Sequence, residues 1–415
     1  MEMSEVNVPK FRFREFEGEW VEKEYGEIYS FFTTNSFSRD KLNYENGLVK
    51  NIHYGDIHTK FSTIFDIRKE DVPFINSDVD LSKIKEESYC QEGDLVIADA
   101  SEDYADIGKT IELKELDNTK LLAGLHTFLA RPDKEQVVVG YMGYLLQSWK
   151  IRKQVMTMAQ GTKVLSLSTK RLAKVKLNLP QKPEQQKIAN FLTSIDQKIE
   201  QLTKKEKLLV AYKKGVMQKI FSQEIRFRDE NGEVYGDWVE RKLGDLSTII
   251  MGQSPDSKSY NSVQDGMYLI QGNADIKNRK SNPRVWTNKP TKLCQENDLI
   301  LTVRAPVGAI AKSLHNACIG RGVCAIRNNE FSDIEYLYQY LLSFEPRWIS
   351  LEQGSTFTAV NANDIKSLKI PTPPKAEQTK IANFLSSIDK KIEQVNRQIE
   401  ESKGFKKGLL QGMFV

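Results

Sequence analysis

Apolar residues follow a helical spacing in two separate stretches of the chain. In the first they recur at intervals of four, three, four, three and seven residues, and in the second the intervals alternate between four and three. This pattern is typical of α-helices that pair as a coiled coil. We predict helices over 181–222 and 374–415, with prolines such as Pro183 and Pro374 at their starts. The expected coiled-coil interface consists of Ile188, Leu192, Ile195, Ile199, Leu202, Leu209, Ile381, Leu385, Ile388, Ile392, Val395 and Ile399.

The two predicted helices carry nearly the same sequence. KIANFLTSIDQKIEQ at 187–201 and KIANFLSSIDKKIEQ at 380–394 agree at 13 of 15 positions, with an offset of 193 residues. The same offset aligns YKKGVMQKIF at 212–221 with FKKGLLQGMF at 405–414. A repeat of this length is too long for a solenoid unit, so it indicates a duplicated module.

The order of segments along the chain predicts how the helices pair. The first helix leaves one variable region and enters the next, and the second helix leaves that next region. If the two seams meet, the second helix returns toward the first region. The pair is then antiparallel, and the two halves form a closed ring with an approximate two-fold axis. The alternative is that each apolar stripe packs separately on its own domain.

The regions between the helices have the composition of compact domains rich in strands. Short apolar runs such as DLVIA and LILTV are separated by Gly, Pro, Asn and Asp, as in strands that end in turns. We expect an α+β fold with two globular domains at 1–180 and 223–373. Their sequences share only scraps, one of which aligns Gly124 with Gly322.

Composition and charge exclude several classes of protein. The chain has 415 residues, of which 40% are apolar and 28% charged, as in ordinary globular proteins. We expect a cytoplasmic protein, because no apolar run could span a membrane and the N-terminal residues lack the layout of a signal peptide. A net charge of +4 permits nucleic-acid binding without requiring it.

Cysteine and histidine patterns give no metal site. The four histidines are scattered, and His126 is expected to be a packed strand residue rather than a ligand. The cysteines lack the spacing of zinc ligands, so they are expected to be buried free thiols. They are Cys90, Cys294, Cys318 and Cys324.

Three motifs and their order carry a resemblance to a known family. A proline followed by EQxKIAxFLxxIDxKIE occurs at 183–200 and again at 374–393, W-V-E segments begin at Trp20 and Trp238, and a GQSP loop lies at 252–255. Together they resemble the specificity subunit of Type I restriction-modification systems over essentially the whole chain. Each motif alone is only moderately specific, whereas their order and duplication are highly specific.

The resemblance implies a non-catalytic subunit that binds double-stranded DNA. Such a subunit would read a bipartite, asymmetric target, with one half-site per target recognition domain, while the helices set the gap between the half-sites. It would dock two methyltransferase subunits, and restriction subunits would join them. No cofactor is implied on this chain; adenosylmethionine, ATP and magnesium are expected on the partner subunits. The only Pro-Pro pair, Pro373–Pro374, leads into a helix rather than forming a methyltransferase [DNS]-P-P-[YFW] motif.

Candidate DNA contacts come from residue type and from the GQSP match, which includes Ser257 and Lys258. Arginine reads guanine, asparagine and glutamine read adenine, and lysine contacts phosphate. The first domain departs from the family pattern, since FFTTNSFSR at 31–39 contains no GxSP. The candidates are Gln253, Ser254, Ser257, Lys258, Gln271, Asn273, Arg304 and Arg321 in the second domain, and Thr33, Thr34, Asn35, Arg39 and Lys163 in the first.

Two other functions remain open on the sequence alone. A scaffold that joins two partners other than nucleic acid would also place divergent domains on a fixed rod, but it predicts no salt-dependent DNA binding. A self-contained methyltransferase would bind adenosylmethionine itself. We predict no catalytic residues, because no Ser-His-Asp or paired-carboxylate arrangement stands out.

Overall fold

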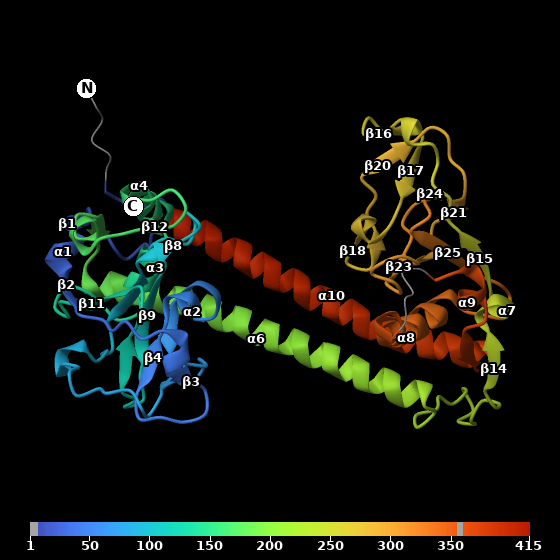
Figure 1. Ribbon diagram of the computed structural model, residues 1–415, viewed down its shortest axis with the longest axis horizontal. Helices are drawn as coiled ribbons and strands as arrows, with labels where there is room; N and C mark the ends of the chain where they lie inside the picture. Colours follow the sequence, from blue (N-terminus) through green and yellow to red (C-terminus); the bar gives the residue numbers. More distant parts are fainter. Residues whose placement is uncertain (1–6, 355–359) are drawn as a thin grey trace. The chain divides into compact units, whose positions relative to one another are not determined.

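The computed structural model describes residues 7–354 and 360–415, apart from the side chains of residues 349–354. The chain forms two compact units. Unit 1 consists of Met1–Leu202 and Gln398–Val415, and unit 2 consists of Thr203–Arg397. Two long helices, α6 (Lys182–Phe221) and α10 (Lys375–Gly412), each contribute to both units (Figure 1).

Unit 1 contains a five-stranded sheet of order β2-β11-β7-β9-β5 and a four-stranded sheet of order β10-β4-β6-β3. Two-stranded pairs join β1 with β13 and β8 with β12. The strands are β1 (Val21–Glu24), β2 (Tyr29–Phe32), β3 (Leu42–Asn43), β4 (Lys50–Ile52), β5 (Ile64–Asp66), β6 (Phe74–Ile75), β7 (Leu95–Ala98), β8 (Ala100–Ser101), β9 (Thr110–Glu115), β10 (Leu121–Ala123), β11 (Thr127–Pro132), β12 (Leu165–Ser166) and β13 (Lys176–Leu179).

Unit 2 contains a six-stranded sheet of order β15-β25-β22-β23-β19-β18 and a five-stranded sheet of order β16-β20-β17-β24-β21. A separate pair joins β14 with β26. The strands are β14 (Val239–Lys242), β15 (Ser247–Met251), β16 (Tyr260–Asn261), β17 (Met267–Ile270), β18 (Ile276–Lys277), β19 (Lys280–Ser281), β20 (Val285–Thr287), β21 (Leu293–Cys294), β22 (Leu299–Thr302), β23 (Ile310–Lys312), β24 (Ala317–Ile319), β25 (Val323–Asn328) and β26 (Lys369–Thr372).

Short helices complete both units. Most are a single turn, whereas α4 and α8 are longer. In unit 1 they are α1 (Tyr25–Ile28), η1 (Arg39–Lys41), α2 (Tyr54–Thr59), η2 (Glu86–Ser88), α3 (Met142–Leu145), α4 (Trp149–Met158) and α5 (Thr169–Leu172). In unit 2 they are α7 (Leu243–Leu246), η3 (Ser257–Ser259), η4 (Asn273–Asp275), α8 (Ile334–Gly354) and α9 (Ala362–Lys366).

The two units repeat one topology. In each, an antiparallel pair (β1·β13 or β14·β26) is followed along the chain by a one-turn helix and by a strand that pairs with the long strand β11 or β25. In each, a parallel pair (β4·β10 or β17·β24) stands next to that core. The predicted α+β fold with an internal repeat is therefore confirmed.

Strand register corrects the weak alignment of Gly124 with Gly322. Strand β10 ends one residue before Gly124, and its counterpart β24 ends one residue before Gly320. Gly124 therefore corresponds to Gly320. The turn of unit 2 contains two glycines, Gly320 and Gly322, so a short sequence match can be displaced by two residues.

Each apolar seam packs on its own domain and also against the opposite helix. One buried cluster of unit 1 combines Ile188, Leu192 and Ile195 of α6 with sheet residues and with Leu409 and Leu410 of α10. A cluster of unit 2 combines Ile381, Leu385 and Ile388 of α10 with Met217 and Ile220 of α6. Among the predicted interface residues, Ile199, Leu202, Leu209 and Ile392 are half-buried and the others are buried.

The helices run antiparallel within unit 1. Asn178, just before α6, donates its side-chain amide to the carbonyl of Val415, just after α10 (3.2 Å). Further along α6, the Asp196 carboxylate contacts the Lys406 ammonium (2.6 Å). Residue numbers therefore increase along α6 in the direction in which they decrease along α10.

Unit 2 shows the same direction from its own contacts. Lys213 Nζ lies 2.6 Å from Asp389 Oδ1, and Lys380 Nζ donates to the carbonyl of Arg228 (2.8 Å). The predicted antiparallel pairing is therefore confirmed in both units.

Candidate nucleic-acid interface

In unit 2, loops that are far apart in sequence meet where strands end. The N–H of Gln253, after β15, donates to the carbonyl of Ile319 at the end of β24 (2.9 Å). The N–H of Gly320 donates to the carbonyl of Ile270 at the end of β17 (2.8 Å). We call the loops that meet here the unit 2 edge loops, and they comprise residues 252–255, 271–274, 303–306 and 320–322.

Glycines permit this close approach. A Cβ atom on Gly252 would lie 2.1 Å from the carbonyl oxygen of Gly320, and one on Gly322 would lie 2.2 Å from that of Gln271. Both distances are far shorter than any real contact, so only glycine fits. The glycine of the GQSP motif thus fixes the backbone that presents the following residues.

The unit 2 edge loops expose most of the predicted DNA contacts. Ser254 is half-buried, and its hydroxyl accepts from the backbone N–H of Arg321 (3.2 Å), which links the first and last loops. Ser257 and Lys258 are exposed in η3, just beyond the first loop. The exposed candidates on the loops themselves are Gln253, Gln271, Asn273, Arg304 and Arg321.

Unit 1 builds the same framework from different residues. The N–H of Asn35 donates to the carbonyl of Ala123 at the end of β10 (3.1 Å), and the N–H of Gly124 donates to that of Ile52 at the end of β4 (2.8 Å). Asn35 therefore occupies the place of Gln253. The unit 1 edge loops comprise residues 33–38, 53–54, 99–100 and 124–126.

A third hydrogen bond matches between the units. The N–H of Asp99 donates to the carbonyl of His126 in unit 1 (3.1 Å), and the N–H of Val303 donates to that of Gly322 in unit 2 (2.9 Å). Three equivalent backbone bonds thus hold two sets of loops that share almost no side chains.

Several predicted contacts in unit 1 have partners inside the chain. Thr34 donates its hydroxyl to the carbonyl of Thr127 (3.0 Å), and the Asn35 amide donates to Asn51 Oδ1 (2.7 Å). The Arg39 guanidinium makes two bonds of 2.9 Å to the buried carboxylate of Asp56. That hydrogen bonding raises the pKa of Arg39. These side chains stabilise the edge loops, and Arg39 keeps roughly half its side-chain surface exposed.

Thr33 and Lys163 are exposed. Lys163 lies two residues before β12, which pairs with β8 directly after Asp99. This pairing brings the Lys163 segment toward the unit 1 edge loops.

The sequence did not identify four residues of the unit 1 edge loops, namely His53, Tyr54, Asp99 and His126. His126 is not a packed strand residue as expected; it precedes β11 with φ 55°, and half of its side chain is exposed. Its ring nitrogen Nδ1 lies 3.3 Å from Asp99 Oδ1. His53 caps α2 by accepting from the N–H of Gly55, and burial lowers its pKa. All four residues come shortly after the end of an apolar strand, and that position is the signal in the sequence that could have identified them.

The duplicated helix motif makes the same polar contacts in both units. Glu184 binds Arg12 through two bonds of 2.8 Å, and its repeat Glu377 binds Arg226 at 2.9 and 3.0 Å. All four side chains are mostly buried. These pairs tie each helix start to the segment that opens each half of the chain.

The next glutamine repeats as well. Gln185 accepts from the N–H of Val138 (3.0 Å), and Gln378 accepts from that of Asp333 (2.8 Å). Further on, the aspartates of the IDxKIE motif pair with the lysines of the [YF]KKG motif. The sequence is duplicated because each copy docks one domain and the end of the other helix.

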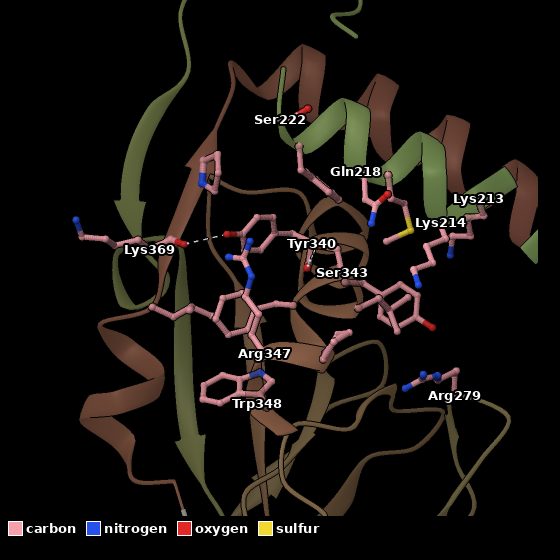
Figure 2. Close-up of a pocket in the computed structure, with 18 of the residues that line it drawn as sticks. Lys213, Lys214, Gln218, Ser222, Arg279, Tyr340, Ser343, Arg347, Trp348 and Lys369 are labelled. Atoms are coloured by element: carbon pink, nitrogen blue, oxygen red, sulfur yellow. Dashed lines mark hydrogen bonds between the residues drawn. The ribbon is translucent and has the colours of Figure 1, made fainter. Parts of the chain in front are cut away.

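A cavity of about 1800 Å³ lies in unit 2 beside α6 and α8, and no edge-loop residue lines it. Figure 2 shows the basic side chains Lys213, Lys214 and Arg279 along this cavity, with the Tyr340 hydroxyl donating to the carbonyl of Lys369 (3.2 Å). The cavity therefore belongs to the helix surface rather than to the candidate DNA surface.

The described residues contain no group of three or more His, Cys, Asp or Glu side chains arranged to hold a metal ion. All four cysteines are buried and free. Within residues 7–354 and 360–415, no helix combines the length and apolarity needed to cross a membrane.

Comparison with known proteins identifies the family. The model of the Type I restriction modification DNA specificity domain matches residues 17–210 and 235–402. The putative type I restriction enzyme MjaX specificity subunit of Methanocaldococcus jannaschii is 32% identical over 422 residues, covering 98% of this chain and 95% of that protein. The type I restriction enzyme HindI specificity subunit of Haemophilus influenzae is 24% identical over 183 residues, 40% of this chain and 39% of that protein.

A solved structure supports the fold. The crystal structure of the Type-I restriction-modification system S subunit from M. genitalium superposes with a TM-score of 0.62 at 13% identity, covering 98% of this chain and 99% of that one. At this identity the match concerns the fold alone. The family match, the duplicated helix and the paired edge loops agree: the chain belongs to the specificity subunits of Type I restriction-modification systems, in which catalysis resides on other subunits.

Proposed function

We propose that this chain binds a bipartite, asymmetric DNA target, with one half-site bound by the edge loops of each unit. The observation that carries the proposal is the set of three matched backbone hydrogen bonds that present unlike side chains. A shared framework places the reading residues alike, while different residues read different bases. Asymmetry of the target follows from the asymmetry of the loops.

The side chains of unit 2 suit major-groove reading. Arg304 and Arg321 can each form a bidentate pair with guanine, and Gln253 and Gln271 with adenine, at ~1–3 kcal/mol per base pair. Lys258 suits a phosphate contact, which supplies affinity without sequence preference. In unit 1 the edge loops offer Thr33 and the His126 region for the same purpose.

We also propose that the two helices dock two methyltransferase subunits, with restriction subunits joining that core. Exposed positions of the [YF]KKG motif support this. Tyr212 on α6 and Phe405 on α10 are repeat partners, and their exposed fractions are 53% and 57%. Because both rings are exposed on this chain, packing within the chain does not explain why both copies have an aromatic residue there.

The following glycines point the same way. A Cβ atom on Gly215 or on Gly408 would meet nothing within 4 Å, although glycine in a helix interior costs about 1 kcal/mol relative to alanine. A small residue beside an exposed aromatic one leaves room for a partner helix. Two copies of the motif suit two copies of one partner.

Adenosylmethionine, ATP and magnesium belong to those partner subunits in this proposal. The lengths of α6 and α10 would set the number of base pairs between the half-sites. Two half-sites on one DNA duplex can be bound together only if the protein holds its two DNA-binding surfaces at a fixed separation.

Methylome sequencing of a strain that expresses this chain with its methyltransferase partner tests the proposal. The expected result is a bipartite motif. Exchanging residues 25–155 for those of a related specificity subunit should change one half of the motif and leave the other half intact. An unchanged motif after the exchange would refute the assignment of half-sites to units.

A binding titration separates this function from the adaptor alternative. DNA recognition predicts that log Kd rises linearly with log salt, because bound lysine and arginine release counterions from phosphates. An adaptor for other partners would show no such slope on duplex DNA. The measurement is fluorescence anisotropy with a labelled DNA duplex that contains the motif found by methylome sequencing.

A further inference from the structure

Three of the four histidines gather around one tyrosine at the unit 1 edge loops. The Tyr54 ring lies 4.7 Å from the His53 ring, 5.9 Å from the His58 ring and 5.3 Å from the His126 ring, measured between centroids. His126 meets Tyr54 edge to face. The cluster joins α2 to the turn between β10 and β11, although these segments are distant in sequence.

His126 is held in place from two sides. Its backbone has φ 55°, a left-handed conformation that sits between two bonded strands. Nδ1 lies 3.3 Å from Asp99 Oδ1, and Asp99 in turn donates its backbone N–H to the carbonyl of His126 (3.1 Å). The side-chain exposure of 52% for His126 against 24% for Asp99 places the carboxylate behind the ring.

The Asp99 carboxylate decides which ring nitrogen of His126 is left to bind an outside partner. A hydrogen on Nδ1 would face the Asp99 carboxylate 3.3 Å away, and that tautomer leaves the lone pair on Nε2. Burial raises the pKa of Asp99, and the neighbouring His126 opposes that shift. A lone pair on Nε2 accepts a hydrogen bond from an exocyclic amine, such as adenine N6 or cytosine N4.

The positions of unit 2 that correspond to this cluster carry no ring. The residues in the corresponding places are Gly322 for His126, Gly272 for Tyr54 and Val303 for Asp99, while the backbone bonds are the same. The ring is therefore an addition to a framework that folds without it. Packing alone does not require an imidazole here.

A buried amide beside the cluster lacks one partner. Asn51 is fully buried, and its Nδ2 atom has no acceptor among the described residues, although its Oδ1 accepts from Asn35. The Nδ2 atom lies 2.3 Å from where a Cβ on Gly124 would stand, so it faces the turn that carries His126. The Asn51 amide therefore has an unused donor beside the turn that carries His126.

We propose that His126 is a specificity-determining residue that reads one base pair of the half-site bound by unit 1, with Asp99 and Tyr54 as positioning residues. The base is one that presents an amine in the major groove, adenine or cytosine. This inference rests on the proposed function, because it assumes that the unit 1 edge loops face DNA.

The test compares methylation motifs in cells that express the chain with its methyltransferase partner. His126→Gly copies the residue that unit 2 uses in the same backbone position, and His126→Asn tolerates the left-handed conformation. Both variants should retain the gap and the unit 2 half of the motif. Methylation of sites altered at one adenine or cytosine position should rise ~10-fold relative to the parent chain.

Asp99→Asn tests the positioning role. It should relax the same base position as His126→Gly, and the double variant should relax that position no further than either single change. A merely structural role for Asp99 would weaken methylation at all sites alike. Thermal unfolding of each purified variant checks that the fold is kept.

Arg321→Ala in unit 2 is the matched control, since it should relax the other half of the motif. If the parent chain gives no bipartite motif, the proposed function fails. If Arg321→Ala relaxes one half while both His126 variants leave the other half unchanged, the proposed function stands and the inference about His126 is overturned.

Discussion

Units 1 and 2 share an ion pair between equivalent strands, but they differ in the charge of one residue on a neighbouring strand. Asp94 binds Arg131 in unit 1 as Asp298 binds Arg327 in unit 2, each through two hydrogen bonds. These pairs occupy equivalent places at the start of β7 and of β22. They hold neighbouring strands together in both units, although the side chains of the edge loops differ.

The strand next to that pair differs in charge. Glu112 lies opposite Leu95 in unit 1, and Lys312 lies opposite Leu299 in unit 2. Glu112 accepts from the backbone N–H groups of Gly140 and Gly143 at 2.7 Å, whereas Lys312 donates to Glu335 on α8. A duplicated fold thus conserves contacts that align its elements and lets the others change.

The largest expected effect concerns the buried glutamates at the helix starts. Glu377→Gln should destabilise unit 2 by ~3–5 kcal/mol, because it leaves the charge of Arg226 without its partner. Glu184→Gln should destabilise unit 1 by less, since Glu377 also accepts from Trp238 Nε1 (2.9 Å). The corresponding Trp20 Nε1 is buried and has no acceptor among the described residues.

Urea unfolding of the purified chain measures both changes. Glu200→Gln is the control, because its exposed pair with Lys69 should contribute about 0–1 kcal/mol. A larger cost for Glu184→Gln than for Glu377→Gln would contradict the comparison.

The second effect concerns Glu112, the buried carboxylate whose counterpart in unit 2 is Lys312. Burial raises the pKa of Glu112 to about 7 from its ordinary value of 4.5, while the two backbone donors oppose the shift. The folded state therefore holds the proton more tightly than the unfolded state. This contribution is complete below pH 4.5 and is lost as the pH rises through 7.

Glu112→Gln should abolish that loss, which amounts to about 3 kcal/mol between the two limits. Thermal unfolding between pH 5 and pH 8 provides the measurement. Glu115→Gln, on the same strand but more exposed, should keep the pH dependence of the parent chain. A parallel pH profile for Glu112→Gln would show that the carboxylate is not the cause.

The third effect compares the lysines that join the two helices. Lys213→Met and Lys406→Met each leave an aspartate without its cation, at an expected cost of ~1–3 kcal/mol. Burial lowers the pKa of Lys213, and Asp389 opposes that shift. A double-mutant cycle of Lys213→Met with Asp389→Asn should give a coupling of ~0.5–3 kcal/mol. A coupling near zero would mean that the contact does not link the helices.

The last effects concern DNA binding rather than stability, through the residues of unit 2 that we propose to contact DNA. Arg321→Ala should weaken binding of the cognate duplex by ~1–3 kcal/mol and relax one base pair. Lys258→Ala should weaken binding to all sequences alike and reduce the slope of log Kd against log salt by about 1. Anisotropy titrations on the cognate duplex and on single-base variants distinguish the two. Equal loss on every duplex for Arg321→Ala would assign it to phosphate instead.

The sequence predicted the elements whose signals are local or repeated. A seam such as Ile188, Leu192 and Ile195 repeats at helical spacing, and the offset copies showed which residues correspond. The candidate Asn35 occupies the place of Gln253, because the chain positions after β2 and after β15 are equivalent.

Contacts made by distant residues could not be predicted in this way. Nothing near Arg39 indicates that Asp56 holds its guanidinium, and nothing near His126 indicates Asp99 or Tyr54. These pairings depend on which strands neighbour one another, and strand order follows from the packing of the whole unit. Residue type alone therefore overstates how many polar side chains are free to contact DNA.

The return of α10 to unit 1 has a consequence for synthesis on the ribosome. Unit 2 is one continuous stretch, Thr203–Arg397, whereas unit 1 needs the last segment of the described chain. Leu409, Leu410 and Phe414 fill its apolar cluster, and Phe11 donates its N–H to the carbonyl of Gly412 (2.7 Å). The half that is synthesised first is therefore completed last, and the part of its apolar cluster that α10 covers stays exposed until that helix is made.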